Sequence, residues 1–113
     1  LISLTDEALM VLYQEGDEKA FEVLYQRHSR RVYGFLRKRL RDSHMADDVF
    51  QATFTKLHAA KGRYQPKYPF LPWLFTVCRS EMLDHFRKSA RNQEDSTPDI
   101  SETIAAPAAD NSQ

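Results

Sequence analysis

The sequence of 113 residues has few of the residues that build disulfides, phosphate-binding loops and metal sites. Its single cysteine, Cys78, excludes an internal disulfide and leaves no cysteine pair for redox or metal chemistry. Its three glycines form no phosphate-binding loop, and neither a nucleophile elbow nor a paired-histidine metal motif is present. We therefore expect a protein that is not an enzyme and that needs no metal and no cofactor.

Long hydrophobic runs are also missing. The longest, around residues 8–13 and 70–78, are too short or too interrupted to span a bilayer. No basic and then apolar leader precedes Leu1. These absences predict no membrane insertion and a cytoplasmic protein. The first residue is not Met, which indicates that the chain is a piece of a longer protein.

Charge is balanced overall but divided unevenly along the chain. Residues 1–91 hold 16 Lys and Arg against 11 Asp and Glu (16 − 11 = +5), whereas residues 92–113 hold no basic residue and five acidic ones (0 − 5 = −5). Residues 27–41 alone carry seven basic residues and no acid. Basic patches of this kind attract polyanions, although a solvated helix face has the same composition.

Apolar residues recur at steps of three and four, which predicts an all-α fold of about four helices. The end signals, Thr5, Gly16, Asp17, Asp42 and Gly62, divide the chain between helices. The predicted helices run near 6–15, 17–41, 43–61 and 70–90. Gly34 inside the second predicted helix indicates either a close helix contact or a bend.

The third predicted helix has two chemically different sides. Its apolar side is formed by Met45, Val49, Phe50, Thr53, Phe54 and Leu57. Its polar side is formed by Asp47, Asp48, Gln51, Thr55 and His58. The apolar side predicts burial against the other helices, and the polar side is then available for a partner.

The segment "KGRYQPKYPF" contains Gly62, Pro66 and Pro69 and shows no period, so it is predicted to be a loop. Tyr64 and Tyr68 stand there beside basic residues. Aromatic rings mixed with cations suit single-stranded nucleic acid, because bases stack on the rings and phosphates are neutralised by the charges.

The last predicted helix has an apolar side and a mostly basic side. The apolar positions are Trp73, Leu74, Val77, Cys78, Met82 and Phe86, and the basic ones are Arg79, Arg87, Lys88 and Arg91. A helix with such a side suits the phosphates of DNA, although a solvated helix looks similar. Beyond it, residues 92–113 are rich in Ala, Pro, Ser and acids. They are predicted to be a disordered acidic tail or linker after a helical domain of residues 5–91.

Three fragments together resemble a known family. They are "GDEKAFEVLYQRHSRRVYGFLRKRLRD", "ADDVFQATFTKLH" and "KGRY…YPFLPWLFTVCRSEMLDHFRK". In this order and at this spacing they resemble region 2 of bacterial sigma factors of the extracytoplasmic-function type. The likeness runs from Thr5 to about Ala90. It implies a small helical domain that binds the clamp helices of the largest RNA polymerase subunit, and that recognises and melts the promoter −10 element.

The resemblance also implies residue roles. Polymerase binding is implied for Asp47, Asp48, Gln51 and Thr55. Contact with promoter DNA, including the non-template single strand, is implied for Arg63, Tyr64, Lys67, Tyr68, Arg79, Arg87 and Lys88. An anti-sigma factor is implied as a further partner. Ala52 and Ser80 stand where the family often has Glu and Asn, and Leu71 and Pro72 replace a more usual polar pair.

Two other readings remain open from the sequence. The first is a helical protein-interaction module that binds polymerase or an anti-sigma factor and has no DNA binding of its own. The second is a small metal- or ligand-binding bundle, since facing helices of a bundle can assemble such a site.

Overall fold

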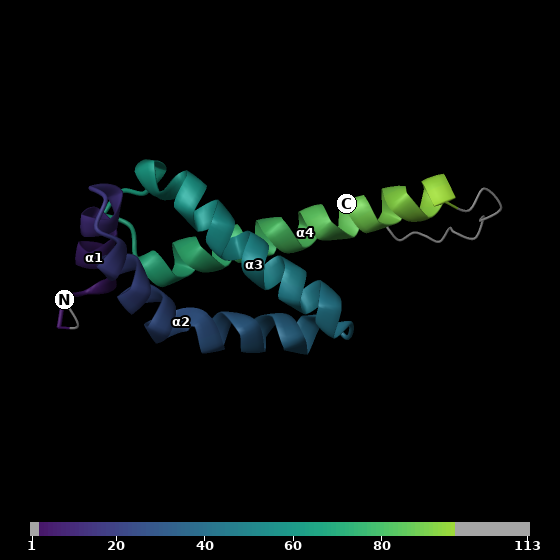
Figure 1. The fold of residues 1–113 in the computed structure, drawn as a ribbon, viewed down its shortest axis with the longest axis horizontal. Coiled ribbons are helices and arrows are strands. Elements are labelled where there is room, and N and C mark those ends of the chain that lie inside the picture. Colours follow the sequence, from purple (N-terminus) through teal and green to yellow (C-terminus); the bar gives the residue numbers. More distant parts are fainter. Residues whose placement is uncertain (1–2, 97–113) are drawn as a thin grey trace. The chain divides into compact units, whose positions relative to one another are not determined.

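The computed structural model describes the backbone of residues 3–96 and the side chains of residues 3–91. Within this range the chain forms four α-helices, one short 3₁₀ helix and no strand (Figure 1). The elements are α1 (Asp6–Gln14), α2 (Glu18–Arg39), α3 (Ser43–Ala60), η1 (Lys61–Arg63) and α4 (Phe70–Ser96). The predicted all-α class is confirmed. The chain divides into two units, Leu1–Cys78 and Arg79–Gln113, and α4 runs through the boundary.

Three helices begin at capping side chains that the sequence signals. The side-chain oxygens of Thr5, Asp17 and Asp42 accept hydrogen bonds from backbone N–H groups in the first turns of α1, α2 and α3. A cap of this kind stabilises a helix by about 1 kcal/mol. Gly16 ends the turn after α1 with a φ of 105°, a conformation that residues with a Cβ rarely adopt.

The core of the first unit is built from the apolar stripes of all four helices. Its fully buried side chains include Leu9, Met10, Leu24, Leu36, Val49, Leu57, Phe70 and Leu74. α1 packs on α2, and α2 packs on α3. Burial of a Leu or Phe side chain contributes about 1.5–3 kcal/mol, so this shared core holds the helices together.

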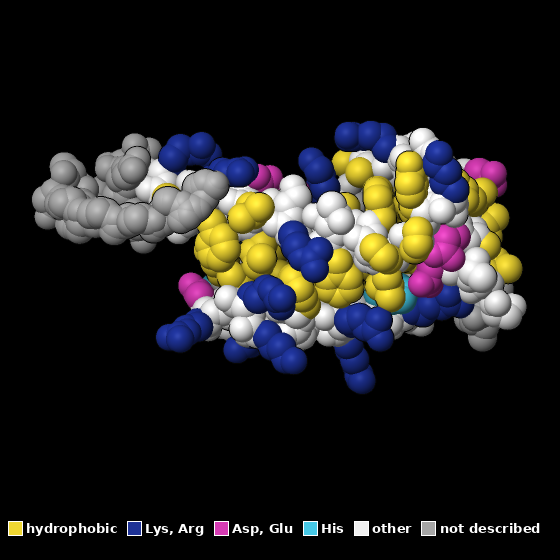
Figure 2. All heavy atoms as spheres, turned by 180° about the vertical axis from the view of Figure 1, so that it is seen from behind, with side chains coloured by type: hydrophobic (Ala, Val, Ile, Leu, Met, Phe, Trp, Pro, Cys, Tyr) yellow, Lys and Arg dark blue, Asp and Glu magenta, His cyan; other side chains and the backbone are white. Residues whose placement is uncertain are grey.

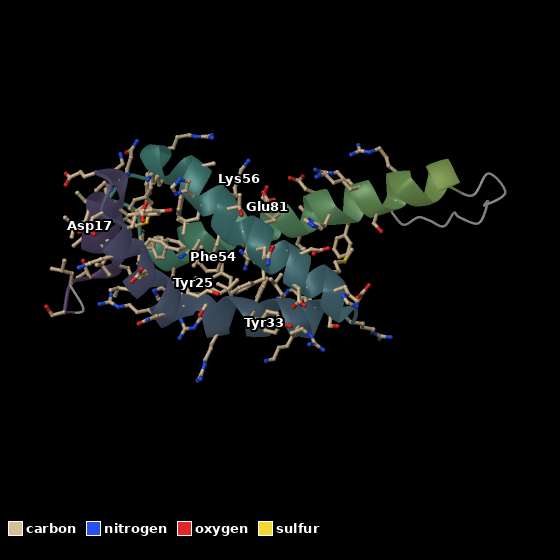
Figure 3. All side chains as sticks on the ribbon, in the orientation of Figure 1. Asp17, Tyr25, Tyr33, Phe54, Lys56 and Glu81 are labelled. Atoms are coloured by element: carbon tan, nitrogen blue, oxygen red, sulfur yellow. The ribbon has the colours of Figure 1, made fainter. Side chains whose placement is uncertain are left out.

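An aromatic cluster fixes the rotation of α3 against α2. Tyr25 and Phe54 lie with ring centroids 5.0 Å apart in an edge-to-face arrangement (Figure 3). Phe50 packs edge-on against both Phe54 and Tyr33, at 5.2 and 5.6 Å. Edge-to-face pairs of this kind contribute about 0.5–1.5 kcal/mol beyond the area they bury. Because these rings hold one side of α3 against α2, the opposite side of α3 faces outward.

The two acids of the first turn of α1 hold the start of α4 and the first half of α2. Glu7 Oε2 accepts a hydrogen bond of 2.8 Å from the backbone N–H of Phe70, the first residue of α4. Asp6 lies 2.9 Å from both Arg27 Nη1 and His28 Nε2. Acids in a first turn are favourable to the dipole of their own helix, and in this structure each of the two also has a long-range partner.

Three sequence expectations differ from the structure. Gly34 was predicted at a close helix contact or bend, yet a Cβ placed there would meet nothing within 4 Å and the residue is exposed. Phe86 was predicted in the core but is 44% exposed. α4 extends to Ser96 rather than ending near Ala90, because residues 91–96 contain neither glycine nor proline. Most of the predicted tail, residues 97–113, lies outside the described residues.

Candidate functional site

The polar side of α3 is an exposed face that contains all four predicted polymerase-binding residues. One residue turns an α-helix by about 100°, so Asp47, Gln51 and Thr55 follow one another at about 40° and Asp48 falls in the same arc. All four side chains are exposed. The face therefore offers two carboxylates, an amide and a hydroxyl along about two turns of helix. Their roles in polymerase binding stay a prediction.

Asp47 is held in place by a neighbour on α2. The hydroxyl of Tyr33 donates a hydrogen bond of 2.8 Å to Asp47 Oδ1. Tyr33 also packs edge-on against Phe50, so its hydroxyl is positioned by the aromatic cluster. By contrast, no hydrogen bond within residues 3–96 uses the side chains of Asp48 or Gln51. These two groups can therefore bind a partner without losing an internal bond.

The side chain of Gln14 ties the loop between α3 and α4 to α1. The side-chain Nε2 of Gln14 donates to the backbone oxygens of Lys61 and Tyr64, at 2.7 and 2.6 Å. Further along, the backbone N–H of Tyr68 donates 3.0 Å to the oxygen of Gln65, which closes a turn with Pro66 at its second position. These bonds give the loop a defined path over the end of α3.

Tyr64 does not have the role predicted for it. The prediction makes it a base-stacking residue, but its side chain is only 3% exposed. Its ring packs edge-on against Trp73 and Phe70, at 5.0 and 6.1 Å between centroids, and its hydroxyl donates to the backbone oxygen of Tyr68. Because the residue is almost wholly buried, Tyr64 supports the loop and is not accessible to a base.

Tyr68 has the exposure that stacking requires. The residue is 50% exposed at the end of the turn, and the ammonium of Lys67 lies 5.3 Å from its ring centroid. Arg63 is exposed at the end of η1. The loop therefore presents one ring and two cations, which is the combination that single-stranded nucleic acid binds.

Four cations of the second unit lie along α4 and do not share one side. Arg87 and Arg91 are four residues apart and so lie within about 40° of each other, whereas Arg79 and Lys88 are nine apart and lie on opposite sides of the helix. Arg87 Nη1 is 3.2 Å from Asp84 Oδ1, an exposed pair. The basic residues predicted to form one side of the last helix therefore do not all lie on one side of α4.

Two buried tyrosines, Tyr13 and Tyr64, have raised pKa values. Burial raises the pKa of the Tyr64 phenol above its ordinary value of 10.0, and the nearby carboxylates of Glu7 and Asp6 act in the same direction. Burial also raises the pKa of Tyr13, with Glu18 adding to the effect. The Tyr13 hydroxyl lies 2.7 Å from His58 Nδ1 on α3. Both phenols are therefore held protonated well into the alkaline range.

Metal and membrane sites have no candidate residues in the part of the chain that is described. Among residues 3–96, no three His, Cys, Asp or Glu side chains gather closely enough to hold a metal ion. No helix in the same range combines the length and the hydropathy that a membrane span needs.

The sequence prediction missed two residues that position the candidate site. Gln14 holds the loop through hydrogen bonds to its backbone, and Glu7 accepts a hydrogen bond from the first residue of α4, which lies 63 residues further along the chain. Both lie in α1 beside ordinary helical neighbours. A local signal for either role does not exist, because the partners are backbone atoms that only the tertiary fold brings close.

Fold and site together define a small helical domain with an exposed acidic and amide helix face and a separate cationic loop. The model of the sigma-70 region 2 family matches residues 24–92, so the chain belongs to that family. Its relatives include sigma factors of the extracytoplasmic-function type, which confirms the resemblance seen in the sequence.

Two curated relatives and one solved structure give the extent of the likeness. The RNA polymerase sigma factor CarQ of Myxococcus xanthus is 40% identical over 78 residues, which cover 69% of this chain and 45% of CarQ. The sigma factor SigM of Bacillus subtilis is 35% identical over 65 residues, 58% of this chain and 39% of SigM. The chain thus spans about half the length of the curated relatives it matches.

The solved structure is an NMR structure of an engineered region 2 of sigmaE in complex with GTAAAA. It matches with a TM-score of 0.74 and 27% sequence identity, over 81% of this chain and 96% of that one.

Proposed function

We propose that this chain is the promoter-melting domain of a transcription initiation factor. It binds core RNA polymerase and captures the non-template single strand of the −10 element, and it carries out no chemical step. The observation that carries the proposal is the loop at the end of α3, where a half-exposed ring and two cations lie on a path fixed by Gln14. Support also comes from the structural neighbour, whose bound hexanucleotide is GTAAAA.

Polymerase binding is assigned to the exposed face of α3. Carboxylates form bidentate, charge-assisted hydrogen bonds with arginines, and an amide both donates and accepts. Asp47, Asp48, Gln51 and Thr55 supply these groups on a rigid helix, which fits a partner helix such as the clamp helices of the largest polymerase subunit. The aromatic cluster and the Tyr33 hydroxyl already fix the position of this face. Binding therefore costs little conformational entropy.

DNA capture is assigned to Arg63, Lys67 and Tyr68 in the loop, and to Arg79, Arg87 and Lys88 on α4. Extrusion of a base from the duplex costs a few kcal/mol. Stacking of that base on an aromatic ring returns about 1–3 kcal/mol, and phosphate contacts add to this. Melting therefore needs only a surface that binds the unstacked strand more strongly than the duplex.

Fluorescence anisotropy with a labelled single-stranded oligonucleotide that contains GTAAAA tests this assignment. We expect Tyr68→Ala to weaken binding about five- to a hundredfold, the equivalent of one lost stacking contact. Gln26→Ala, at an exposed position of α2 outside the loop, serves as the control and should bind like the parent. We expect Lys88→Ala to reduce the salt dependence by about 0.7 in the slope of log K against log salt. Full binding by Tyr68→Ala at every salt concentration would refute the loop assignment.

The second candidate function is a protein-interaction module that binds polymerase or an anti-sigma factor without DNA. The exposed α3 face favours it as much as it favours the first proposal, because that face is suited to protein. Single-stranded binding that is absent, or that ignores salt, supports the module. We place either activity in the cytoplasm, where polymerase and promoter DNA are found.

A further inference from the structure

α2 carries a group of exposed cations that neither candidate interface uses. Arg30, Arg31, Arg37 and Lys38 are exposed on the side of α2 away from the buried Val32 and Leu36; these four residues form the α2 stripe. Figure 2 shows dark-blue side chains projecting along the lower margin of the molecule, where α2 runs. No acidic residue occurs between residues 27 and 41 to neutralise them from the same helix.

Helix geometry arranges the α2 stripe as two parallel rows. Arg30 and Arg37 are seven residues apart, as are Arg31 and Lys38, so each pair is aligned to within about 20° along the helix axis. The stripe is about 12 Å long at 1.5 Å per residue. Duplex DNA carries about one phosphate charge per 1.7 Å of axis. A length of duplex equal to that of the stripe therefore carries several phosphates.

Gly34 lies in the middle of the α2 stripe with open space around it. A glycine within an exposed helix costs about 1 kcal/mol relative to alanine, and the packing contact that would compensate is not there. Its effect on the surface is to leave the backbone of α2 uncovered between the two ends of the stripe. The backbone of another molecule can approach the helix closely at this point.

The neighbouring basic residues of α2 have internal partners and are not part of the stripe. Arg27 pairs with Asp6, and the guanidinium of Arg39 lies 3.8 Å above the Phe35 ring. The stripe residues make no ion pair with any side chain of residues 3–91. Their charges are therefore available to a ligand.

We propose that the α2 stripe binds the phosphate backbone of double-stranded DNA. This extends the proposed function, since a domain that holds a melted strand lies beside duplex. A duplex fits better than a single strand because no exposed aromatic residue lies between residues 30 and 41 to stack bases. It fits better than a protein because the stripe has no large exposed apolar residue to anchor a protein interface.

Two matched pairs of variants in the full chain test this proposal. The probe is a labelled duplex of unrelated sequence, titrated at several salt concentrations. Lys38→Gln should reduce the salt slope by about 0.9, whereas Lys56→Gln, on α3 (Figure 3) and exposed, should leave it unchanged. Gly34→Glu should bind about threefold more weakly than Gly34→Gln at low salt, because it sets a negative charge close to the phosphates. Both substitutions at Gly34 favour the helix, so folding is retained.

Equal slopes for Lys38→Gln and Lys56→Gln together with equal affinities for the two Gly34 variants would overturn the proposal, as would a parent that does not bind duplex. Loss of binding to a polyglutamate peptide without loss of duplex binding would assign the stripe to an acidic protein instead. The titration with the single-stranded oligonucleotide tests the proposed function separately. That binding depends on Tyr68 and not on the α2 stripe, so the single-strand proposal and the duplex proposal can fail independently.

Discussion

Gln14 is predicted to control both the stability of the domain and the position of the DNA-binding loop. Its amide nitrogen donates to two backbone oxygens, at 2.7 and 2.6 Å, in the part-buried space between α1 and the loop. Gln14→Ala removes both bonds and leaves two carbonyl groups without this partner. At a net value of about 0.5–1.5 kcal/mol for each bond, the free energy of unfolding falls by about 1–3 kcal/mol.

The variant Gln14→Glu, which introduces a negative charge, makes the test sharper. A carboxylate has nearly the same shape as the amide but accepts hydrogen bonds and cannot donate them, so it faces two carbonyl oxygens with like partial charge. We expect Gln14→Glu to be less stable than Gln14→Ala at neutral pH. Gln26→Ala, on the exposed part of α2, is the control and should change stability by no more than about 0.5 kcal/mol.

Urea denaturation monitored by circular dichroism measures these differences, and thermal unfolding should move by about 4–8 °C per kcal/mol. Binding to the single-stranded oligonucleotide should weaken in both Gln14 variants at temperatures where they remain folded, because the loop loses its tie to α1. If Gln14→Glu matches the parent in stability, the amide does not hold the loop and the argument fails.

Two more predictions follow from burial and backbone geometry. Gly34→Ala should raise the free energy of unfolding by about 0.5–1 kcal/mol, since the added methyl meets open space; a loss of stability in urea would show a hidden packing role. The pKa values of Tyr13 and Tyr64 are higher in the folded chain than the value of about 10 for an unfolded phenol. Their contribution to the free energy of unfolding is therefore fully present below pH about 10, and it is lost as pH rises through the pKa values of the folded chain. Thermal unfolding should therefore show a fall in stability above pH about 10 that is smaller in Tyr64→Phe, and an identical fall in that variant would contradict the assignment.

Local features of the fold are predictable from the sequence. Thr5, Asp17 and Asp42 cap the helices that they precede, because a capping bond needs only the next two or three residues. The two sides of α3 also follow from spacing alone: Val49 and Leu57 are buried, and Asp48 is exposed.

Features that depend on tertiary contacts are not predictable in this way. Tyr64 and Tyr68 look alike in the sequence, since both lie in a loop next to a cation. The structure separates them because Trp73 and Phe70 enclose one ring, while the turn after Gln65 places the other outside. Phe86 has core spacing yet is exposed, since a helical period states which side a residue is on and not whether anything covers that side.

Affinity for core RNA polymerase shows whether the polar side of α3 is the polymerase interface. The parent chain, the double variant Asp48→Ala/Gln51→Ala and the control Lys56→Ala are compared by biolayer interferometry on immobilised polymerase, with helicity checked by circular dichroism. We expect the double variant to bind at least tenfold more weakly with unchanged helicity, while the control binds like the parent. Equal affinity of the double variant and the parent would contradict this assignment.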